Sequence, residues 1–347
     1  MVSSGRKRTE HYQLVRTMTQ QEFLQDLEAF LKEWRNDEPT LWVHTSGSTG
    51  TPKPLLVEKE RMRTSASLTC KFLGLQEGDS ALLCMPLQYI AGKMVVVRSE
   101  VANLKLIPVA PSGHPLAGLQ EIPTFSAMIP MQVYNSIQVE EEKEKLMRIK
   151  HLIIGGGSID PSLAQTLKDF PNHVWSTYGM TETLSHIALR RLNGPEASDW
   201  YTPFEHVSIR LSDENTLAIY APNICPEELI TNDIAEINEK GKFRILGRKD
   251  NTINSGGVKI QIEQVEELLR TQLNIPFQIT ASPDSKFGEI VVLIYNKVEN
   301  KNLIKEICEK TLPPYWVPKK YIGVEEIPMT GTGKPDRATA RRIASEK

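Results

Sequence analysis

Apolar and polar positions along the first two hundred residues predict strands and helices in turn. Thr19-Gln20-Gln21-Glu22 has capping-box spacing and precedes apolar residues on one helical face, which predicts a packed amphipathic helix. The short apolar runs that follow predict strands at 41–44, 81–85, 104–109, 124–129, 151–154 and 174–176. Strands that alternate with helical segments indicate an α/β domain with a mostly parallel sheet, where ligands collect at the carboxyl ends of the strands.

The pattern changes near residue 205, where predicted strands follow one another without intervening helices. They span 207–211, 216–220, 234–237 and 243–246 and indicate a small antiparallel subdomain. Beyond Asp250 the pattern mixes helices at 262–269, 303–312 and 337–347 with strands at 278–281, 290–295 and 321–324. We therefore expect a large N-terminal domain of residues 1–247 and a small α+β C-terminal domain of residues 248–347.

Composition excludes several classes of protein. The 347 residues suggest at least two domains, with 24% charged and 40% hydrophobic residues, as is ordinary for a globular chain. The net charge of -2 argues against a general nucleic-acid binder. No CxxC pair, long apolar run or signal-peptide leader is present, so we expect no zinc site, disulfide framework or membrane span, and a reduced cytoplasmic setting.

The most informative segment is residues 45–53, which read Thr-Ser-Gly-Ser-Thr-Gly-Thr-Pro-Lys directly after an apolar run. Glycines can turn backbone N–H groups inward, hydroxyls add donors and lysine adds a positive charge, so this loop suits a polyphosphate. It is not a Walker A loop, because Pro52 stands where the second glycine of that motif belongs. A plain Ser/Gly-rich surface turn has the same composition. The candidate phosphate-binding residues are Thr45, Ser46, Gly47, Ser48, Thr49, Gly50 and Lys53.

Two further polar segments follow predicted strands. Three consecutive glycines would let the backbone approach a flat ligand, and the alternative is a plain flexible turn; they are Gly155, Gly156 and Gly157. Residues 178–183 read Tyr-Gly-Met-Thr-Glu-Thr and bring together an aromatic ring, hydroxyls and a carboxylate. Glu182 suits Mg²⁺, which binds through one or two carboxylates plus substrate phosphates, whereas a lone glutamate in a loop is simply solvated.

The last two segments carry charges suited to a nucleotide. Asp233 is followed fifteen residues later by Arg248, and such a pair suits the vicinal hydroxyls of ribose together with phosphate or ribose oxygens. Residues 330–334 read Thr-Gly-Thr-Gly-Lys, a glycine-rich loop that presents Lys334. Taken alone, this loop would be a turn with a solvated charge.

In this order the segments closely resemble the motifs of the adenylate-forming enzymes, which include acyl- and aryl-CoA synthetases, adenylation domains and luciferases. The resemblance extends from residue 45 to residue 334. It implies a large N-terminal domain, a mobile C-terminal domain and two half-reactions. A carboxylate first attacks the α-phosphate of Mg·ATP to give an acyl-adenylate and pyrophosphate. A thiol, usually that of coenzyme A, then displaces AMP to form a thioester.

The resemblance also implies a role for each nucleotide-binding motif. The loop at 45–53 would hold the β- and γ-phosphates, and the glycines at 155–157 would form part of the adenine site. Tyr178 would stack on the base, and Thr181 would contact the α-phosphate. Glu182 would bind Mg²⁺.

The remaining roles concern the ribose, the hinge and the second half-reaction. Asp233 and Arg248 would hold the ribose, and Asp250 would be the hinge residue. Lys334 would bridge the substrate carboxylate and the α-phosphate in the first half-reaction only, because it supplies charge that the two approaching anions need. The residues facing the pantetheine of coenzyme A would be Gly256, Gly257 and Lys259.

The chain departs from the family pattern in three places. Only 44 residues precede the phosphate loop, so we expect part of the usual N-terminal subdomain to be missing. This difference would affect dimerisation, and the resemblance admits a homodimer. Asn251 and Asn254 stand where aspartate and lysine are common, which puts some inter-domain contacts in doubt. Tyr89 takes the place of the aromatic residue that usually gates the acyl pocket.

The substrate is suggested by residues 92–98, which read Gly-Lys-Met-Val-Val-Val-Arg. This segment is similar to the corresponding part of the o-succinylbenzoate–CoA ligases of menaquinone biosynthesis, where an arginine suits the second, aromatic carboxylate of the substrate. We hypothesise that Arg98 binds that carboxylate, helped by Ser185 or His186. The alternative is that Arg98 is a surface residue on an amphipathic helix.

The sequence is therefore compatible with three functions. A CoA ligase for o-succinylbenzoate leads. Another aryl- or acyl-CoA ligase, or a stand-alone adenylation enzyme that loads a carrier protein, comes second. A nucleotide-binding module without activity comes third, and the lysine reserved for transition-state charge argues against it. The expected ligands are ATP, Mg²⁺, coenzyme A and a small carboxylic acid.

Overall fold

The computed structural model describes residues 18–44, 54–157, 159–330 and 335–346. Its largest element is a seven-stranded sheet of order β4-β3-β5-β6-β7-β8-β9, in which the first five strands are parallel and β8 runs antiparallel to both of its neighbours, β7 and β9. This confirms the predicted α/β fold with a mostly parallel sheet. The strands are β3 Ser80–Leu83, β4 Lys105–Pro108, β5 Phe125–Met128, β6 His151–Ile154, β7 His173–Gly179, β8 His186–Arg191 and β9 Thr202–Pro203.

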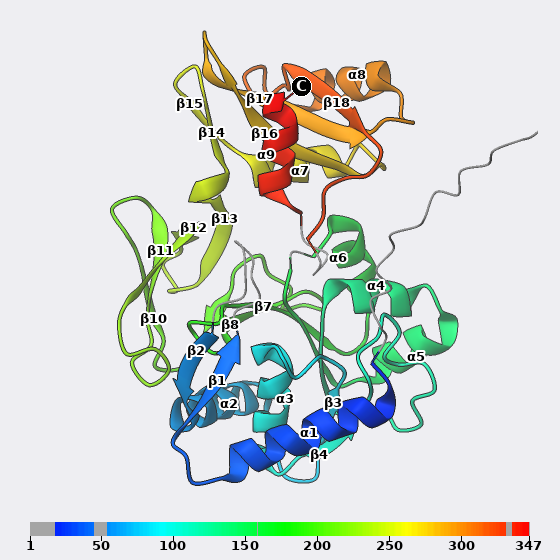
Figure 1. The fold of residues 1–347 in the computed structure, drawn as a ribbon, viewed down its shortest axis with the longest axis vertical. Helices are drawn as coiled ribbons and strands as arrows, with labels where there is room; N and C mark the ends of the chain where they lie inside the picture. Colours follow the sequence, from blue (N-terminus) through cyan, green and yellow to red (C-terminus); the bar gives the residue numbers. More distant parts are fainter. Residues whose placement is uncertain (1–17, 45–53, 158, 331–334, 347) are drawn as a thin grey trace, which may run out of the picture.

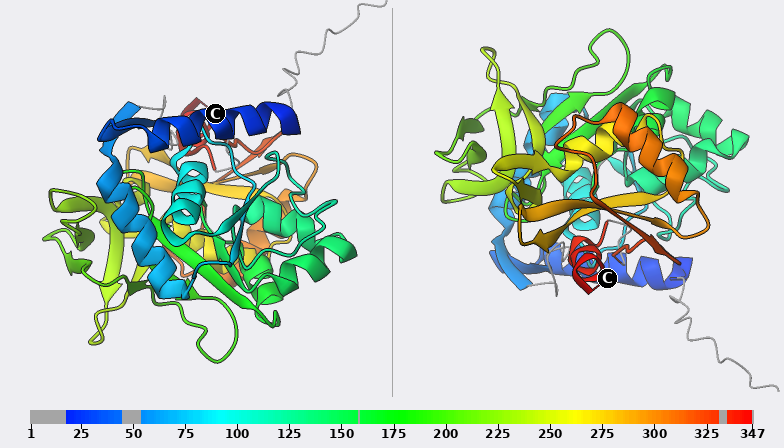
Figure 2. Two further views of the ribbon diagram at one scale, coloured as in Figure 1. Left: turned by 90° about the horizontal axis from the view of Figure 1, so that it is seen from below. Right: turned by 90° about the horizontal axis from the view of Figure 1, so that it is seen from above.

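Helices cover both faces of this sheet (Figures 1 and 2). They are α1 Gln20–Arg35, α2 Lys59–Leu73, α3 Ile90–Ala102, α4 Pro130–Ile137, α5 Glu140–Arg148 and α6 Pro161–Leu167. Alternate residues of one strand enter different cores: Ala81 and Leu83 pack with α1 to α3, whereas Leu82 packs with α4 to α6. Burial on both faces explains why these strands read as continuous apolar runs.

The first helix has the predicted start and the predicted buried face. Thr19 Oγ1 accepts from the N–H of Glu22 at 3.2 Å, and Thr19 N–H donates to Glu22 Oε2 at 2.9 Å, which completes the capping box. Phe23, Phe30 and Trp34 are buried on the face that meets the core. The prediction of a packed amphipathic helix is therefore confirmed, and α1 lies along the outer side of the large part of the molecule (Figure 2).

The first predicted strand does not join the parallel sheet. β1 (Thr40–His44) pairs antiparallel with β2 (Pro54–Glu58) in a separate two-stranded sheet, so its assignment to the large sheet was wrong. Its burial pattern gives the reason, because Leu41 and Val43 are buried while Trp42 is 54% exposed. A strand buried on one face suits a surface hairpin better than a sheet covered by helices on both faces.

The predicted antiparallel subdomain is present. Its four strands lie in sequence order in one sheet and occupy the left of Figure 1. They are β10 Ser208–Leu211, β11 Thr216–Tyr220, β12 Leu229–Ile237 and β13 Phe243–Arg248. Asp233 of β12 is the register partner of Arg248 on β13, so residues fifteen positions apart in sequence become neighbours.

The C-terminal part forms the upper portion of Figure 1 around a five-stranded sheet. Its elements are the 3-10 turn η1 Lys249–Asn251, strands β14 Thr252–Ser255, β15 Val258–Gln261, β16 Phe277–Asp284, β17 Gly288–Asn296 and β18 Lys320–Val324, and helices α7 Ile262–Arg270, α8 Lys301–Thr311 and α9 Arg337–Glu346. The helices and the last three strands agree with the predicted pattern. The hairpin of β14 and β15 was not predicted, because its polar, glycine-rich sequence was interpreted as hinge alone.

Within the described residues, each buried hydrophobic cluster draws its members from only one side of Asp250. The division into two domains at this residue stays a prediction. The described helices include none that combines the length and the apolar character needed to cross a bilayer.

Candidate active site

The connection between β7 and β8 is a tight turn that depends on Gly179. A Cβ atom at this position would lie 2.3 Å from Ser185 O and 2.4 Å from His186 Cα, so no side chain fits there. Thr183 closes the turn from inside: it is fully buried, its Oγ1 accepts from Met180 N–H at 3.0 Å, and it lies 2.7 Å from Ser185 O. β7 also runs through Tyr178 and Gly179, so these two residues lie in the strand and not after it as predicted.

The turn presents Glu182 outward. Glu182 is exposed, whereas Thr181 and Thr183 on either side of it are buried. The described residues contain no group of three or more side chains of the metal-ligating types His, Cys, Asp and Glu.

Tyr178, Asp233 and Arg248 form one polar cluster. The Tyr178 hydroxyl donates to Asp233 Oδ2 at 2.6 Å, and Arg248 Nη1 donates to Asp233 Oδ1 at 3.3 Å. The cluster brings together three residues that the sequence placed in one nucleotide site. A carboxylate has about four acceptor sites, so Asp233 keeps capacity for the hydroxyls of a ribose.

Aromatic side chains hold the Tyr178 ring in place. The centroid of the Phe243 ring lies 5.0 Å away in an edge-to-face arrangement, and that of Tyr201 lies 5.8 Å away. Burial and the neighbouring Asp233 carboxylate raise the pKa of the Tyr178 hydroxyl far above its usual range, so the hydroxyl stays protonated and acts as a donor. Tyr201 and Phe243 were not predicted as site residues, since aromatic positions in a strand usually indicate only core packing.

The three glycines follow β6 at the carboxyl edge of the sheet. A Cβ atom on Gly155 would lie 2.4 Å from Thr177 Oγ1 of the adjacent strand β7, and Gly156 has a φ of +83°. The glycines thus let this loop pass close to β7 directly beside Tyr178. This places them where a flat ligand packed near Tyr178 would meet backbone.

Arg248 also links the cluster to the predicted hinge. Its Nη2 donates to Asp250 Oδ2 at 3.2 Å, and Asn232 Nδ2 donates to the same oxygen at 3.1 Å. Asp250 lies in the short turn η1 between β13 and β14. The carboxylates of Asp233 and Asp250 therefore share one arginine.

Tyr89 lies beside the end of β1 that leads into the candidate phosphate loop at residues 45–53. It immediately precedes α3 and pairs with His44 in a parallel bridge. Lys93 of α3 holds the hairpin of β1 and β2, because its Nζ donates to Trp42 O at 2.9 Å. The loop itself, with all seven candidate phosphate-binding residues, lies outside the described residues.

Arg98 is buried, which contradicts the alternative of a surface residue on an amphipathic helix. Its exposed fraction is 2%, and its helix α3 is buried on most sides. Arg98 Nη2 donates to Ser185 Oγ at 2.6 Å, while its buried Nε has no hydrogen-bond partner among the described residues. Burial lowers the pKa of the guanidinium to about 10, so it stays charged at neutral pH.

The positions predicted to face coenzyme A lie in the C-terminal part, at the hairpin of β14 and β15. Gly256 and Gly257 form the turn of the hairpin of β14 and β15, with φ values of +58° and +85°, and Lys259 is exposed on β15. The N–H of Gly256 donates to Phe287 O at 2.8 Å, which ties this turn to the sheet. Lys334 lies outside the described residues.

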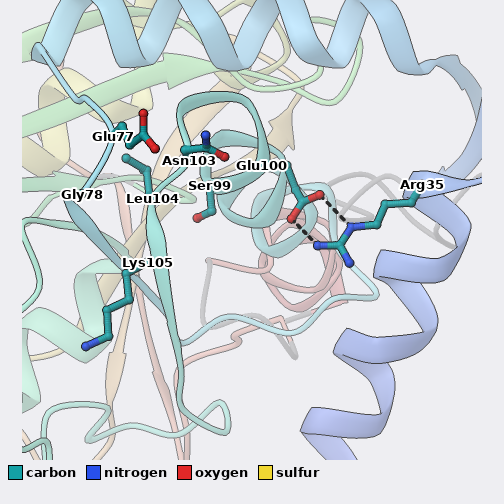
Figure 3. A pocket seen from close by; sticks show the side chains of 8 residues that line it. All are labelled: Arg35, Glu77, Gly78, Ser99, Glu100, Asn103, Leu104 and Lys105. Atoms are coloured by element: carbon teal, nitrogen blue, oxygen red, sulfur yellow. Dashed lines mark hydrogen bonds and ion pairs between the residues drawn. The ribbon is translucent and has the colours of Figure 1, made fainter.

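A separate shallow pocket of about 600 Å³ lies at the far end of α3 (Figure 3). It is lined by Arg35, Glu77, Gly78, Ser99, Glu100, Asn103, Leu104 and Lys105. Its Arg35 and Glu100 side chains bind each other at 2.8 Å, and Lys105 begins strand β4. Because ligands of parallel sheets bind at the carboxyl ends of strands, this pocket belongs to the wrong edge for the active site.

Comparison with known proteins decides the family. A family model described as AMP-binding enzyme matches residues 5–224. The chain belongs to this AMP-binding enzyme family. An acyl-CoA synthetase (AMP-forming)/AMP-acid ligase II-like protein from Dyadobacter fermentans is 32% identical, with 93% of this chain and 95% of that chain covered and a TM-score of 0.64. The resemblance to the adenylate-forming enzymes is thereby confirmed.

Two further relatives of this AMP-binding enzyme carry more specific names. The 2-succinylbenzoate–CoA ligase of Listeria monocytogenes is 25% identical over 341 residues, which cover 88% of this chain and 70% of that protein. The o-succinylbenzoate coenzyme A synthetase of Bacillus subtilis, solved with ATP and a magnesium ion, is 20% identical, with 86% of this chain and 68% of that chain covered and a TM-score of 0.71. At this level of identity the second likeness shows the fold alone.

Proposed function

We propose that this AMP-binding enzyme is an ATP-dependent carboxylate–CoA ligase that converts o-succinylbenzoate into its CoA thioester. The observation that carries the choice of acid is the buried Arg98, which has no carboxylate within ion-pair distance among the described residues. A buried charge is costly unless it is paired. A substrate that brings a second carboxylate supplies the missing partner.

The nucleotide cluster supports the first half-reaction. Asp233 would accept from the ribose hydroxyls, with its carboxylate oriented by Tyr178 and Arg248 at 2.6 and 3.3 Å. The glycines beside Tyr178 would give the adenine ring room to pack. Glu182 would hold Mg²⁺, whose charge offsets that of the phosphates as two anions approach each other.

The reaction then proceeds by two displacements. A carboxylate oxygen of the substrate forms a bond to the α-phosphorus, and the bond from that phosphorus to the pyrophosphate oxygen breaks. Lys334 would offset the charge on the α-phosphate during this step, and the Thr181 hydroxyl would donate a hydrogen bond to it. In the second step the sulfur of coenzyme A attacks the acyl carbon, and AMP leaves with its oxygen. The thiol proton goes to solvent.

Arg98 and Ser185 would recognise the far end of the acid. Arg98 donates to Ser185 Oγ at 2.6 Å, and Ser185 directly follows the turn that carries Thr181 and Glu182. The aromatic carboxylate would meet this pair while the succinyl carboxylate reaches the α-phosphate. Tyr89, beside the phosphate-loop hairpin, would gate the acyl pocket between the two ends.

The proposal includes a mobile C-terminal domain. Residues after the hinge at Asp250 would bring Lys334 to the site for the first step. They would then bring the turn of Gly256 and Gly257, with Lys259, to the pantetheine for the second step. The resemblance to the family also admits a homodimer, and light scattering would measure the oligomeric state.

A pyrophosphate-release assay tests the function. The purified enzyme is mixed with ATP, Mg²⁺ and either o-succinylbenzoate or a panel of benzoates, other aryl acids and fatty acids, with and without coenzyme A. We expect pyrophosphate with o-succinylbenzoate and thioester only when coenzyme A is added. Pyrophosphate without thioester under all conditions would instead support an adenylation enzyme that loads a carrier protein, and a different preferred acid would overturn the choice of substrate.

A further inference from the structure

A chain of buried polar side chains extends behind the Arg98–Ser185 pair. Ser185 Oγ lies 3.3 Å from His186 Nδ1, and His186 Nε2 lies 3.0 Å from Thr69 Oγ1. Thr69 Oγ1 in turn lies 3.3 Å from Ser65 O, one turn back on α2. The chain therefore joins α3, the end of the β7–β8 turn and α2.

The direction of each hydrogen bond follows from the groups at the two ends. Ser65 O can only accept, so Thr69 donates its hydroxyl proton there and accepts from His186 Nε2–H. In a neutral imidazole the other nitrogen is then an acceptor, so His186 Nδ1 accepts the proton of the Ser185 hydroxyl. The Ser185 oxygen is left to accept from Arg98, which is the contact observed.

The surroundings keep this arrangement in one orientation. Thr69 is fully buried, and the exposed fraction of His186 is 6%. The His186 ring lies edge-to-face against Phe204 with centroids 5.5 Å apart. Burial and, second, the nearby charge of Arg98 hold the pKa of His186 well below its usual value, so the imidazole is neutral at physiological pH. Ser185 alone among these side chains is partly exposed, so a ligand would meet the chain there.

We propose that Thr69 and His186 are positioning residues that fix the Ser185 hydroxyl and the Arg98 guanidinium for the second carboxylate of the substrate, and so set the preference for a dicarboxylic acid. This inference rests on the proposed function. Neither residue touches the reacting atoms. Without the acceptor at His186 Nδ1, the Ser185 hydroxyl is free to turn its proton toward Arg98 or toward the incoming carboxylate.

The kinetic test compares Thr69→Val, which removes the hydroxyl at nearly constant volume, with Thr69→Ser, which keeps it. In Thr69→Val we expect KM for o-succinylbenzoate to rise about tenfold, as for the loss of one buried hydrogen bond, while KM for benzoate changes by less than about twofold. Thr69→Ser should restore the wild-type ratio. Equal changes for both acids in Thr69→Val, or no change for either, would overturn the proposal.

A second measurement tests the hydrogen-bond network itself, and it does so even if the enzyme prefers another acid. Proteins labelled with ¹⁵N at histidine and arginine are compared by NMR at pH 7.5, with His186 and Arg98 signals assigned from His186→Gln and Arg98→Lys. We expect His186 protonated at Nε2 only, and an Arg98 Nε–H signal that moves in Thr69→Val but not in Thr69→Ser. An Nδ1-protonated or charged imidazole, or an Arg98 signal unmoved in both variants, would contradict the inference independently of the substrate.

Discussion

At the scale of single residues, Arg98 shows what helical periodicity cannot predict. Apolar positions on α3 occur on nearly every side of the helix, so no polar face marks where its arginine points. Only the folded chain shows that the guanidinium is 2% exposed and donates to a serine 87 residues away. The role proposed for Arg98 came from the resemblance of residues 92–98 to the o-succinylbenzoate ligases, not from periodicity.

Replacing Arg98 by alanine is the direct test of its proposed role. We expect KM for o-succinylbenzoate to rise about 10- to 100-fold, because a charge-assisted hydrogen bond contributes roughly 1.5 to 3 kcal/mol. KM for a benzoate-like monoacid should hardly change, since that acid has no second carboxylate. Arg98→Lys is the matched control, as it keeps the charge but loses the planar fork. Equal losses for both acids would count against this role.

His151 gives a pH-dependent prediction. It is 4% exposed, and both ring nitrogens lack partners among the described residues. Burial and, next, the neighbouring His173 lower the pKa of His151 to about 4. As the pH falls, His151 therefore takes up a proton in the unfolded chain before it does so in the folded protein. The contribution of His151 to the free energy of unfolding has its full value above pH 6.5 and decreases as the pH drops toward 4.

The size of that effect has an upper bound of about 3.5 kcal/mol, since each unit of pKa difference corresponds to about 1.4 kcal/mol. Urea denaturation at pH 7.5 and pH 5 measures it. We expect His151→Phe to weaken the dependence on pH, while the exposed His206→Gln should leave it as in the wild type. A slope unchanged by His151→Phe would show that other groups cause the acid sensitivity.

At the scale of elements, the pattern of buried residues and the residues in the turns decided which strands could be predicted from the sequence. The five parallel strands were predicted because each is a short apolar run, and three of them, β3, β5 and β6, are followed by a helix. β14 and β15 were missed, although Gly256-Gly257 at positive φ is the signature of a two-residue hairpin turn. The flanking residues 252–255 and 258–261 are largely polar, since one side of this hairpin faces solvent, so no continuous apolar run marks the strands.

The turn between β7 and β8 gives the element-scale prediction. A Cβ at Gly179 would lie 2.3 Å from Ser185 O, a contact with backbone that no side-chain rotation relieves. We therefore expect Gly179→Ala to lower the free energy of unfolding by roughly 1 to 3 kcal/mol, as overpacking does, and to reduce adenylation by displacing the turn. The control is Gly157→Ala, whose Cβ would meet nothing closer than Pro130 Cγ at 3.9 Å. Equal stability of the two variants by chemical denaturation would contradict this reading of the turn.

At the scale of the whole molecule, the site is assembled from contacts between distant parts of the chain. Tyr178 and Asp233 are 55 residues apart, and Thr69 and His186 are 117 apart. The sequence predicted that Tyr178, Asp233 and Arg248 share a ligand because known motifs occur in a known order. Nothing in the sequence of α2 singles out Thr69, since a threonine inside a helical pattern carries no signal of its distant partner.

The C-terminal part holds both sides of the loop that contains Lys334. Before the loop, Pro328 O accepts from Gln278 Nε2 and from the N–H of Asp336. After it, Arg337 donates to the buried Glu266 at 2.5 and 2.7 Å. These contacts attach residues 328, 336 and 337, which flank the undescribed residues 331–334, to strand β16 and helix α7. A movement of this part as one unit would therefore carry Lys334 with it.

Domain alternation predicts that Lys334 serves one half-reaction and not the other. Lys334→Ala should abolish pyrophosphate release from ATP and o-succinylbenzoate, because the approaching anions lose a fixed positive charge. It should leave thioester formation from supplied acyl-adenylate and coenzyme A within about twofold of wild type, since by then the lysine has left the site. Lys259→Ala is the control for the other half-reaction: we expect slower thioester formation and unchanged pyrophosphate release. If Lys334→Ala slows both half-reactions equally, one fixed arrangement of the two parts serves both steps, and the hinge at Asp250 has no catalytic role.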